Sequence, residues 1–314
     1  MKRRDFLQKT SLAGLTAAVG STVVNAQTAM PMRPYGDTGI MLSCIGFGGI
    51  VVRDVEPEHA QEVVAKAVEQ GINYFDVAPT YGNAEERLGP ALEPFRDQVF
   101  LAEKTQKRDA EGAKQEMEES LEKLRTDHFD LYQLHALSEM EDVEEAFAKG
   151  GCMETFIKAR EEGVVKYLGF SAHNDKVAIE AMNRFDFDSI LFPFNFSTWH
   201  QGSFGPEVMR VAQQKNVARL ALKAMARNRW TEGADRSAFP KCWYEPVTDD
   251  QETEMALKFT LSLDVTAAVP PGEEVLFWRA VDFAKQSMPI QTVERDSIQQ
   301  LAMNAKPVLF QTSL

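Results

Sequence analysis

The chain has 314 residues and a formal charge of −13 at pH 7. This length suits one closed barrel of strands and helices, which typically takes about 250 residues. The acidic balance excludes the basic stripe of a nucleic-acid-binding protein. The three cysteines, Cys44, Cys152 and Cys242, form no CxxC pair, which argues against a zinc or iron–sulfur site and leads us to expect no bound metal.

The N-terminus has the order of an export signal. A basic stretch, Met1–Lys9, is followed by a run without charge, Thr10–Met32, which contains the small-x-small sequence Val24–Ala26. The RRDFL sequence that begins at Arg3 resembles the twin-arginine signals that export folded proteins. We therefore expect residues 1–26 to be a twin-arginine-type signal peptide, with the twin-arginine export machinery as partner of the precursor. The mature protein, residues 27–314, is then expected in a bacterial periplasm.

Two alternatives for this segment are an amphipathic or anchoring first helix and a signal that is retained. The run is rich in Ala, Gly, Ser and Thr, which hold a bilayer poorly. We accordingly expect no stable membrane insertion.

Beyond Arg33, apolar runs alternate with helical patterns, which is typical of parallel βαβ units. The predicted strands are Leu42–Gly49, Asn73–Ala78, Val99–Thr105, Phe129–His135, Val164–Ser171, Ser189–Asn195, Val217–Met225 and Thr266–Val269. The predicted helices are one that opens at Pro57, one capped by Asn83, one that carries Met117, Leu121 and Leu124, and those near Glu154–Glu162, Lys176–Asn183, Pro206–Lys215, Gln251–Ser262 and Glu273–Lys285.

Eight such units predict an α/β fold, a single-domain (β/α)8 TIM barrel with a short C-terminal tail. A doubly wound open sheet gives the same local signals. However, no Gly-x-Gly-x-x-Gly follows a strand, so the usual dinucleotide fingerprint of the open sheet is missing. The longest break, Ala226–Thr248, is rich in Arg, Trp and Pro and is predicted to be an excursion from the barrel.

Four polar residues fall at or just after predicted strand ends: Asp76, Tyr81, Lys104 and His135. In a barrel these ends form one mouth, where catalytic groups collect. Each residue alone has a structural explanation, such as a loop cap, a rim cation or a satisfied histidine. Together they suggest chemistry, because a charged lysine within about 4–6 Å lowers the pKa of a tyrosine. For the tyrosine to exchange its proton at neutral pH, its pKa would have to fall by about three units, which corresponds to roughly 4 kcal/mol of interaction energy.

Three stretches resemble the signatures of the aldo-keto reductases: FDVAPTYGNAEERLGPAL (Phe75–Leu92), LAEKT (Leu101–Thr105) and LYQLHA (Leu131–Ala136). The resemblance runs from Arg33 to about Lys285. It implies an NAD(P)(H)-dependent oxidoreductase that reduces an aldehyde, ketone or keto-sugar carbonyl to an alcohol, or catalyses the reverse reaction.

The resemblance also assigns the catalytic roles. Tyr81 is expected to protonate the carbonyl oxygen as hydride arrives from the nicotinamide. Lys104, paired with Asp76, is expected to depress the pKa of Tyr81, and His135 to orient and polarise the carbonyl. The cofactor contacts implied by the family are Gly49, Asp76, Ser171, Asn195, Lys223 and Gly272.

The cofactor half departs from the family pattern. Ala172 stands where an Asn is usual, and Leu222 replaces an aromatic residue that often stacks on the nicotinamide. Lys223, Arg227 and Arg229 offer cations for the pyrophosphate, although they also fit a solvated basic loop.

The expected phosphate clamp opens a helix with Glu273 and Glu274. Carboxylates there repel a 2′-phosphate, so a weakened preference for NADP(H) and acceptance of NAD(H) are expected. The alternative is that both side chains point to solvent.

Two further interpretations stay open: a nicotinamide-binding barrel that acts as a sensor with little turnover, and a cofactor-free sugar isomerase or lyase. An exported reductase also lacks a pool of reduced nicotinamide. This suggests that the protein folds around its dinucleotide before export and then holds it nearly permanently.

Overall fold

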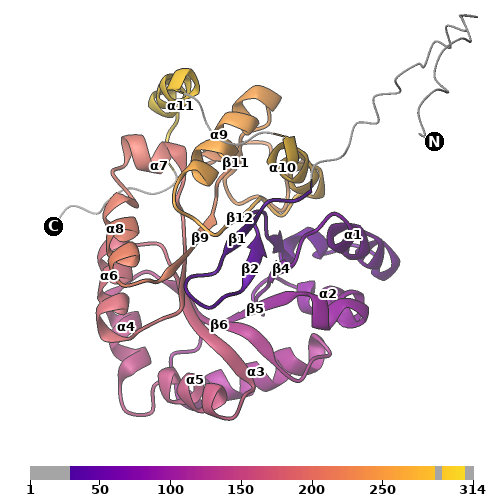
Figure 1. The fold of residues 1–314 in the computed structure, drawn as a ribbon, viewed down its shortest axis with the longest axis vertical. Coiled ribbons are helices and arrows are strands. Elements are labelled where there is room, and N and C mark those ends of the chain that lie inside the picture. The colour runs from indigo at the N-terminus through magenta and orange to yellow at the C-terminus, as the bar shows by residue number, and fades with distance from the viewer. Residues whose placement is uncertain (1–28, 287–291, 308–314) are drawn as a thin grey trace, which may run out of the picture.

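The computed structural model describes residues 29–286 and 292–307, and the predicted signal peptide, residues 1–26, lies outside these ranges. Eight parallel strands form one sheet in the order β12-β9-β8-β7-β6-β5-β4-β3. A bridge between Ile45 and Ala268 joins the two ends of the sheet, with Gly46 N donating to Ala268 O at 2.9 Å. The predicted TIM barrel is confirmed, and its helices ring the strands (Figure 1).

The strands of the barrel are β3 (Phe47–Gly48), β4 (Tyr74–Asp76), β5 (Phe100–Thr105), β6 (Phe129–Leu137), β7 (Val165–Ala172), β8 (Ser189–Phe192), β9 (Ala218–Leu222) and β12 (Ala267–Val269). The helices are η1 (Gly49–Val52), α1 (Pro57–Glu69), α2 (Ala84–Leu92), η2 (Glu93–Gln98), α3 (Ala110–Lys123), α4 (Met140–Phe147), α5 (Cys152–Glu161), α6 (Asp175–Arg184), α7 (Phe196–Gln201), α8 (Pro206–Gln214), α9 (Asp250–Ser262), α10 (Glu274–Gln286) and α11 (Thr292–Asn304).

Several strands are shorter than the sequence predicts, for local reasons. β8 ends at Phe192 because Pro193 has no N–H for the ladder. β9 ends at Leu222 because the next residue, Lys223, has a φ of +63°. The predicted first strand is divided in two, since Met41–Ser43 (β2) turns back to pair with Met32–Pro34 (β1).

The β1–β2 hairpin closes the N-terminal end of the barrel. Tyr35, which follows β1, is fully buried, and its OH donates to Ser189 Oγ at 2.9 Å. Its ring packs against Phe100 and Tyr167. Side chains therefore fill the inside of the barrel at this end.

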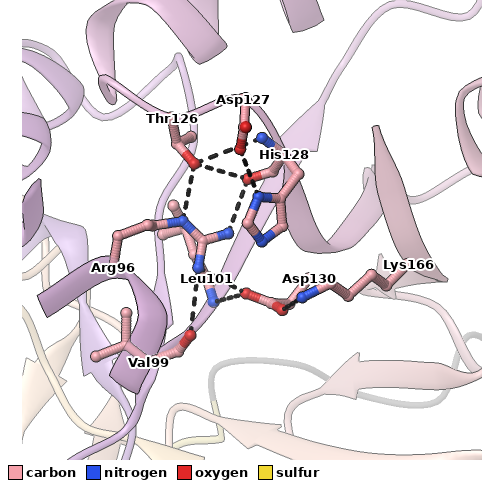
Figure 2. A network of polar contacts seen from close by, with 8 residues as sticks. All are labelled: Arg96, Val99, Leu101, Thr126, Asp127, His128, Asp130 and Lys166. Carbon is pink, nitrogen blue, oxygen red and sulfur yellow. Dashed lines mark hydrogen bonds and ion pairs between the residues drawn. The ribbon is translucent and has the colours of Figure 1, made fainter. Parts of the chain in front are cut away.

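A second polar network braces the same end of the barrel (Figure 2). Asp130, near the start of β6, pairs with Arg96 at 3.0 Å and Lys166 at 2.8 Å, and accepts from Leu101 N at 2.9 Å. Burial by itself raises the pKa of Asp130, but these donors outweigh it and the pKa is lowered. The network is remote from the strand ends that carry the predicted catalytic residues, so its role is structural.

One predicted cap is wrong. Asn83 precedes α2, but its side chain makes no capping hydrogen bond. Instead Asn83 Oδ1 accepts from Asp54 N at 2.8 Å, because the loop after η1 passes close to the start of α2. The residue fastens two loops at the mouth.

Within the segment after Lys285, the described helix α11 packs against other helices of the barrel. α11 packs on α7 and α9 through an apolar cluster that includes Phe196, Phe259, Ile298 and Leu301. Among the described residues, no helix is long and apolar enough to cross a bilayer.

Candidate active site

A pocket of about 500 Å³ opens at the C-terminal ends of the strands. Asp76 ends β4, Lys104 lies in β5 and His135 in β6, while Tyr81 stands in the loop between β4 and α2. All four line this pocket. The structure therefore brings together the four residues that the sequence predicts as catalytic.

Lys104 is held by an ion pair inside the barrel. Its Nζ donates to Asp76 Oδ1 at 2.6 Å and to Val77 O at 2.7 Å, and the side chain is 1% exposed. Asp76 Oδ2 accepts from Tyr74 OH at 3.1 Å and from Gln133 Nε2 at 3.2 Å. Burial by itself lowers the pKa of Lys104, but neighbouring negative groups, Asp76 first, raise it. Lys104 is therefore a charged ammonium.

Tyr81 lies against this ammonium. Lys104 Nζ is 5.0 Å from the centroid of the Tyr81 ring. Burial raises the pKa of Tyr81, Lys104 opposes that rise by its charge and a hydrogen bond, and Asp76 adds to it. Lys104 thus lowers the pKa of Tyr81, as predicted, but burial and Asp76 raise it by more, so the net pKa lies above its usual value rather than near neutrality. Lys104 offsets part of the cost of burial, and Tyr81 keeps its proton.

His135 contacts Tyr81 edge to face, with ring centroids 5.8 Å apart and planes at 87°. Burial, followed by the charges of Lys104, Arg108 and Lys223, lowers the pKa of His135 to about 3. The imidazole is therefore neutral at physiological pH and can donate one hydrogen bond to a carbonyl oxygen. Its Nδ1 is buried and has no hydrogen-bond partner within the described part of the chain.

The predicted cofactor contacts divide into two groups. Ser171, Lys223 and Gly272 line the pocket with Asp76, whereas Gly49 and Asn195 are not among its lining residues. A Cβ on Gly49 would meet Val77 Cγ2 at 2.6 Å. The glycine therefore allows η1 to pack closely on Val77, which directly follows β4.

Asn195 has its amide occupied within the protein. Its Oδ1 accepts from Ser197 N at 2.8 Å and caps α7, and its Nδ2 donates to Lys223 O at 2.7 Å and Ala226 O at 2.8 Å. The residue thus fixes the turn after β9. Leu191, from β8, reaches the pocket instead.

The excursion Ala226–Thr248 returns to the mouth of the barrel. It contains a short antiparallel pair, β10 (Ala226–Asn228) and β11 (Glu245–Pro246). Between them the segment Pro240–Tyr244, which we call the strap, lines the pocket. Lys241 Nζ donates to Val51 O at 2.8 Å and so ties the strap to η1. The sequence did not predict that these residues line the pocket, because the path of a loop depends on its tertiary contacts and leaves no periodic pattern in the sequence.

Glu273 and Glu274 both have partners, so neither simply points to solvent. Glu273 Oε1 accepts from Lys241 N at 2.5 Å and anchors the strap. Glu274 Oε2 lies 2.6 Å from His59 Nε2, and its Oε1 accepts from Trp278 Nε1 at 3.0 Å. Burial raises the pKa of Glu274, but these contacts outweigh it and the pKa is lowered. Both side chains therefore hold structure at the expected clamp.

Comparisons with known proteins identify the family. Residues 44–267 match the model of the Aldo/keto reductase family. The uncharacterized oxidoreductase YqkF of Bacillus subtilis is 25% identical over 272 residues, which are 77% of this chain and 87% of that protein. The L-galactose dehydrogenase of Arabidopsis thaliana is 28% identical over 159 residues, 46% of this chain and about half (49%) of its own length.

Solved structures agree. An aldo-keto reductase from Bacillus halodurans, in its holo form, superposes with a TM-score of 0.67 at 25% identity, over 89% of this chain and 98% of that one. A putative aldo-keto reductase from Pseudomonas aeruginosa gives a TM-score of 0.67 at 21% identity, over 83% of this chain and 98% of its own, which shows the fold. The chain belongs to the aldo-keto reductase family and is an oxidoreductase enzyme.

The family generally uses NAD(P)H on small carbonyl compounds, and the pocket fits such a cofactor. Its basic lining residues are Arg53, Lys104, Lys223, Arg236 and Lys241, whereas Asp76 is the only carboxylate that the described residues contribute to the lining. Since Asp76 is already paired with Lys104, the remaining arginines and Lys241 offer hydrogen-bond donors that suit a pyrophosphate. In the described ranges no group of three His, Cys, Asp or Glu side chains is placed to hold a metal ion.

Proposed function

We propose that the protein is an NAD(P)(H)-dependent reductase that converts an aldehyde, ketone or keto-sugar carbonyl to an alcohol, or catalyses the reverse. One observation carries the proposal. The buried Lys104 ammonium, 2.6 Å from Asp76, lies under the Tyr81 ring while a neutral His135 contacts that ring edge to face. This arrangement places a proton donor, a cation and a hydrogen-bond donor around one point in the pocket.

The bound nicotinamide would supply the hydride. The chain supplies the proton and the orientation of the substrate. His135 donates a hydrogen bond to the carbonyl oxygen, and Tyr81 OH protonates that oxygen as negative charge develops on it. The Lys104 ammonium stabilises the tyrosinate that Tyr81 becomes, and Asp76 keeps Lys104 charged. In the reverse direction Tyr81 acts as the base.

The dinucleotide would lie between the strand ends and the strap. Ser171 Oγ accepts from Ala136 N at 2.7 Å, and its own hydrogen remains available to a nicotinamide amide. Arg53 and Lys241 line the side of the pocket near Gly272, where a pyrophosphate would meet the start of α10. Asn195 and Gly49 stay predictions as cofactor contacts; Asn195 would have to exchange internal hydrogen bonds to serve as one.

Weak discrimination between NADPH and NADH is part of the proposal. Glu273 and Glu274 place two carboxylates at the clamp, where a 2′-phosphate would lie. Their partners His59 and Lys241 N offset this charge only in part. The idea fails if titration shows NADPH bound more than about a hundredfold, or roughly 2.7 kcal/mol, tighter than NADH.

Export by the twin-arginine route to a periplasm also remains a proposal, supported by the sequence of residues 1–26. Such a route lets the barrel fold around its dinucleotide before it crosses the membrane. Purified protein that carries neither bound dinucleotide nor absorbance at 340 nm would contradict a permanently held cofactor.

Oxidation of NADPH and NADH by a panel of reactive aldehydes, ketones and keto-sugars tests the function. Sugars belong in the panel because one relative is named an L-galactose dehydrogenase. We expect turnover by the wild type and a loss of about 10²–10⁴ in kcat for Tyr81→Phe. If both proteins are equally inert while dinucleotide still binds, the barrel is a sensor. Turnover of a sugar without nicotinamide would identify an isomerase or lyase.

A further inference from the structure

Lys223 has a buried side chain and a left-handed backbone at the mouth of the barrel. It directly follows β9, is 5% exposed and has a φ of +63°, a conformation that residues with side chains seldom adopt. Asn195 holds the turn by donating to Lys223 O and Ala226 O. The fold keeps Lys223 at the pocket at a conformational cost, which is typical of functional positions.

The amine of Lys223 has neutral neighbours. Its Nζ lies 2.9 Å from His173 Nε2 and 4.5 Å from the centroid of the Trp243 ring. Within residues 29–286 and 292–307, no carboxylate reaches ion-pair distance of this Nζ. Burial lowers the pKa of Lys223 well below its usual value. The site thus contains a buried basic group that lacks a counter-charge among the described residues.

Lys223 is separate from the cations on the clamp side of the pocket. Lys241 is bonded to Val51 O and lies near Arg53, beside Glu273. Lys223 instead interacts with His173 and acts electrostatically on His135. The pocket therefore has two cations, Arg53 and Lys241, beside the expected phosphate clamp, and a separate basic group, Lys223, beside the residues that would handle the carbonyl.

We propose that Lys223 and His173 form a subsite that binds a carboxylate on the substrate, so that the enzyme prefers carbonyl acids to neutral carbonyl compounds. The inference rests on the proposed reductase function and names its substrate class. With His173 in the tautomer whose Nε2 is the acceptor, Lys223 Nζ donates one hydrogen to it and keeps another for a ligand in the pocket. A carboxylate oxygen accepts this second hydrogen, and its negative charge favours the protonated amine, so that the pair forms a strong charge-assisted hydrogen bond. Its carbonyl then lies toward His135 and Tyr81.

Matched aldehydes test this in the wild-type enzyme. The probes are 4-carboxybenzaldehyde against 4-formylbenzamide, and the 3-substituted pair, each reduced with saturating NADPH or NADH. The members of a pair differ in charge and little in shape. We expect kcat/KM for at least one acid to exceed that of its amide by about tenfold or more, mainly through KM. Equal values, or a preference for the amide in both pairs, would overturn the proposal.

Variants assign the preference to its residue. Lys223→Met keeps the length of the side chain without its charge, and the acid-to-amide ratio is expected to fall to about one. Lys223→Arg restores a cation and is expected to retain part of the ratio. The Kd of NADPH, from fluorescence titration, is measured in each variant. If Lys223→Met weakens dinucleotide binding and leaves the ratio intact, Lys223 serves the cofactor and the inference is wrong.

Failure of the inference differs from failure of the proposed function. If the amides are reduced as well as the acids, the reductase function stands and the carboxylate subsite is wrong. If no aldehyde in either pair oxidises either dinucleotide, the carboxylate subsite is wrong, and the reductase function is wrong as well only if the full panel of aldehydes, ketones and keto-sugars is also inert. The wild-type comparison decides even where Lys223→Met does not fold, because it needs no variant.

Discussion

Replacement of Asp76 by asparagine separates stability from catalysis at the centre of the site. Asp76 is buried and accepts from Lys104 Nζ, Tyr74 OH and Gln133 Nε2. The substituted amide would be nearly isosteric but uncharged, and it would face these donors with a donor of its own. Breaking one partner of a buried ion pair typically costs about 3–5 kcal/mol, because the other charge stays buried. We expect a loss near the lower end, since Lys104 keeps its bond to Val77 O.

The same change, Asp76→Asn, is expected to lower kcat by about 10²–10³, because Lys104 without its main counter-charge is held less firmly as an ammonium and stabilises the tyrosinate less. Urea unfolding followed by tryptophan fluorescence measures the first effect, and steady-state oxidation of NADPH or NADH by an aldehyde measures the second. KM should change little, since Asp76 acts on the substrate only through Lys104 and Tyr81.

Asp130→Asn is the matched control. It removes a carboxylate from an ion pair at the opposite end of the barrel (Figure 2), where Lys166 is about half exposed, at 52%. We expect a smaller loss of stability, about 1–3 kcal/mol, and kcat within about twofold of the wild type. The reasoning is refuted if Asp76→Asn keeps kcat within about threefold of the wild type, or if Asp130→Asn lowers kcat as far as Asp76→Asn does.

Three further outcomes follow from the structure. Reduction uses protonated Tyr81, whose raised pKa keeps the proton in place, so kcat should stay flat through pH 8 and fall only above about pH 10, while oxidation should rise with pH. His135 has a pKa of about 3, so the dependence of the rate on pH should show no titration step near pH 6.5. A step with its midpoint near pH 6.5 would contradict a neutral imidazole. Glu273→Ala removes the acceptor for Lys241 N, and it should speed the release of both dinucleotides about tenfold in stopped-flow fluorescence. Glu273→Gln keeps an acceptor and should change mainly the ratio of the affinities for NADPH and NADH. Equal release rates in the two variants would exclude a role for this hydrogen bond.

The sequence was sufficient to predict the barrel and to predict that the four candidate catalytic residues share one pocket. Alternating strands and helices are local patterns, and the ends of parallel strands meet by geometry, so Asp76, Lys104 and His135 had to share one mouth. Even Tyr81 follows from its spacing in the loop after β4.

Longer-range features were not readable. The sequence missed α4, α7 and α11, which are short or stabilised by contacts distant in the chain. It also gave no sign that the amide of Asn195, which stays a predicted cofactor contact, is hydrogen-bonded to the turn that carries Lys223. The direction of a polar side chain depends on which backbone groups lie nearby, and that is decided only when the elements pack.

Electrostatics shows the same division. The sequence correctly placed Lys104 beside Tyr81 but not the depth of burial, which raises the pKa of Tyr81 despite the neighbouring charge. Similarly, Glu273 and Glu274 were identified as two charges at the clamp, yet only the folded chain brings them His59 and the strap. Residue identity along the chain determined which charges the site contains. The tertiary structure decided which of them are buried and which are paired, because desolvation and ion pairing depend on neighbours far apart in the sequence.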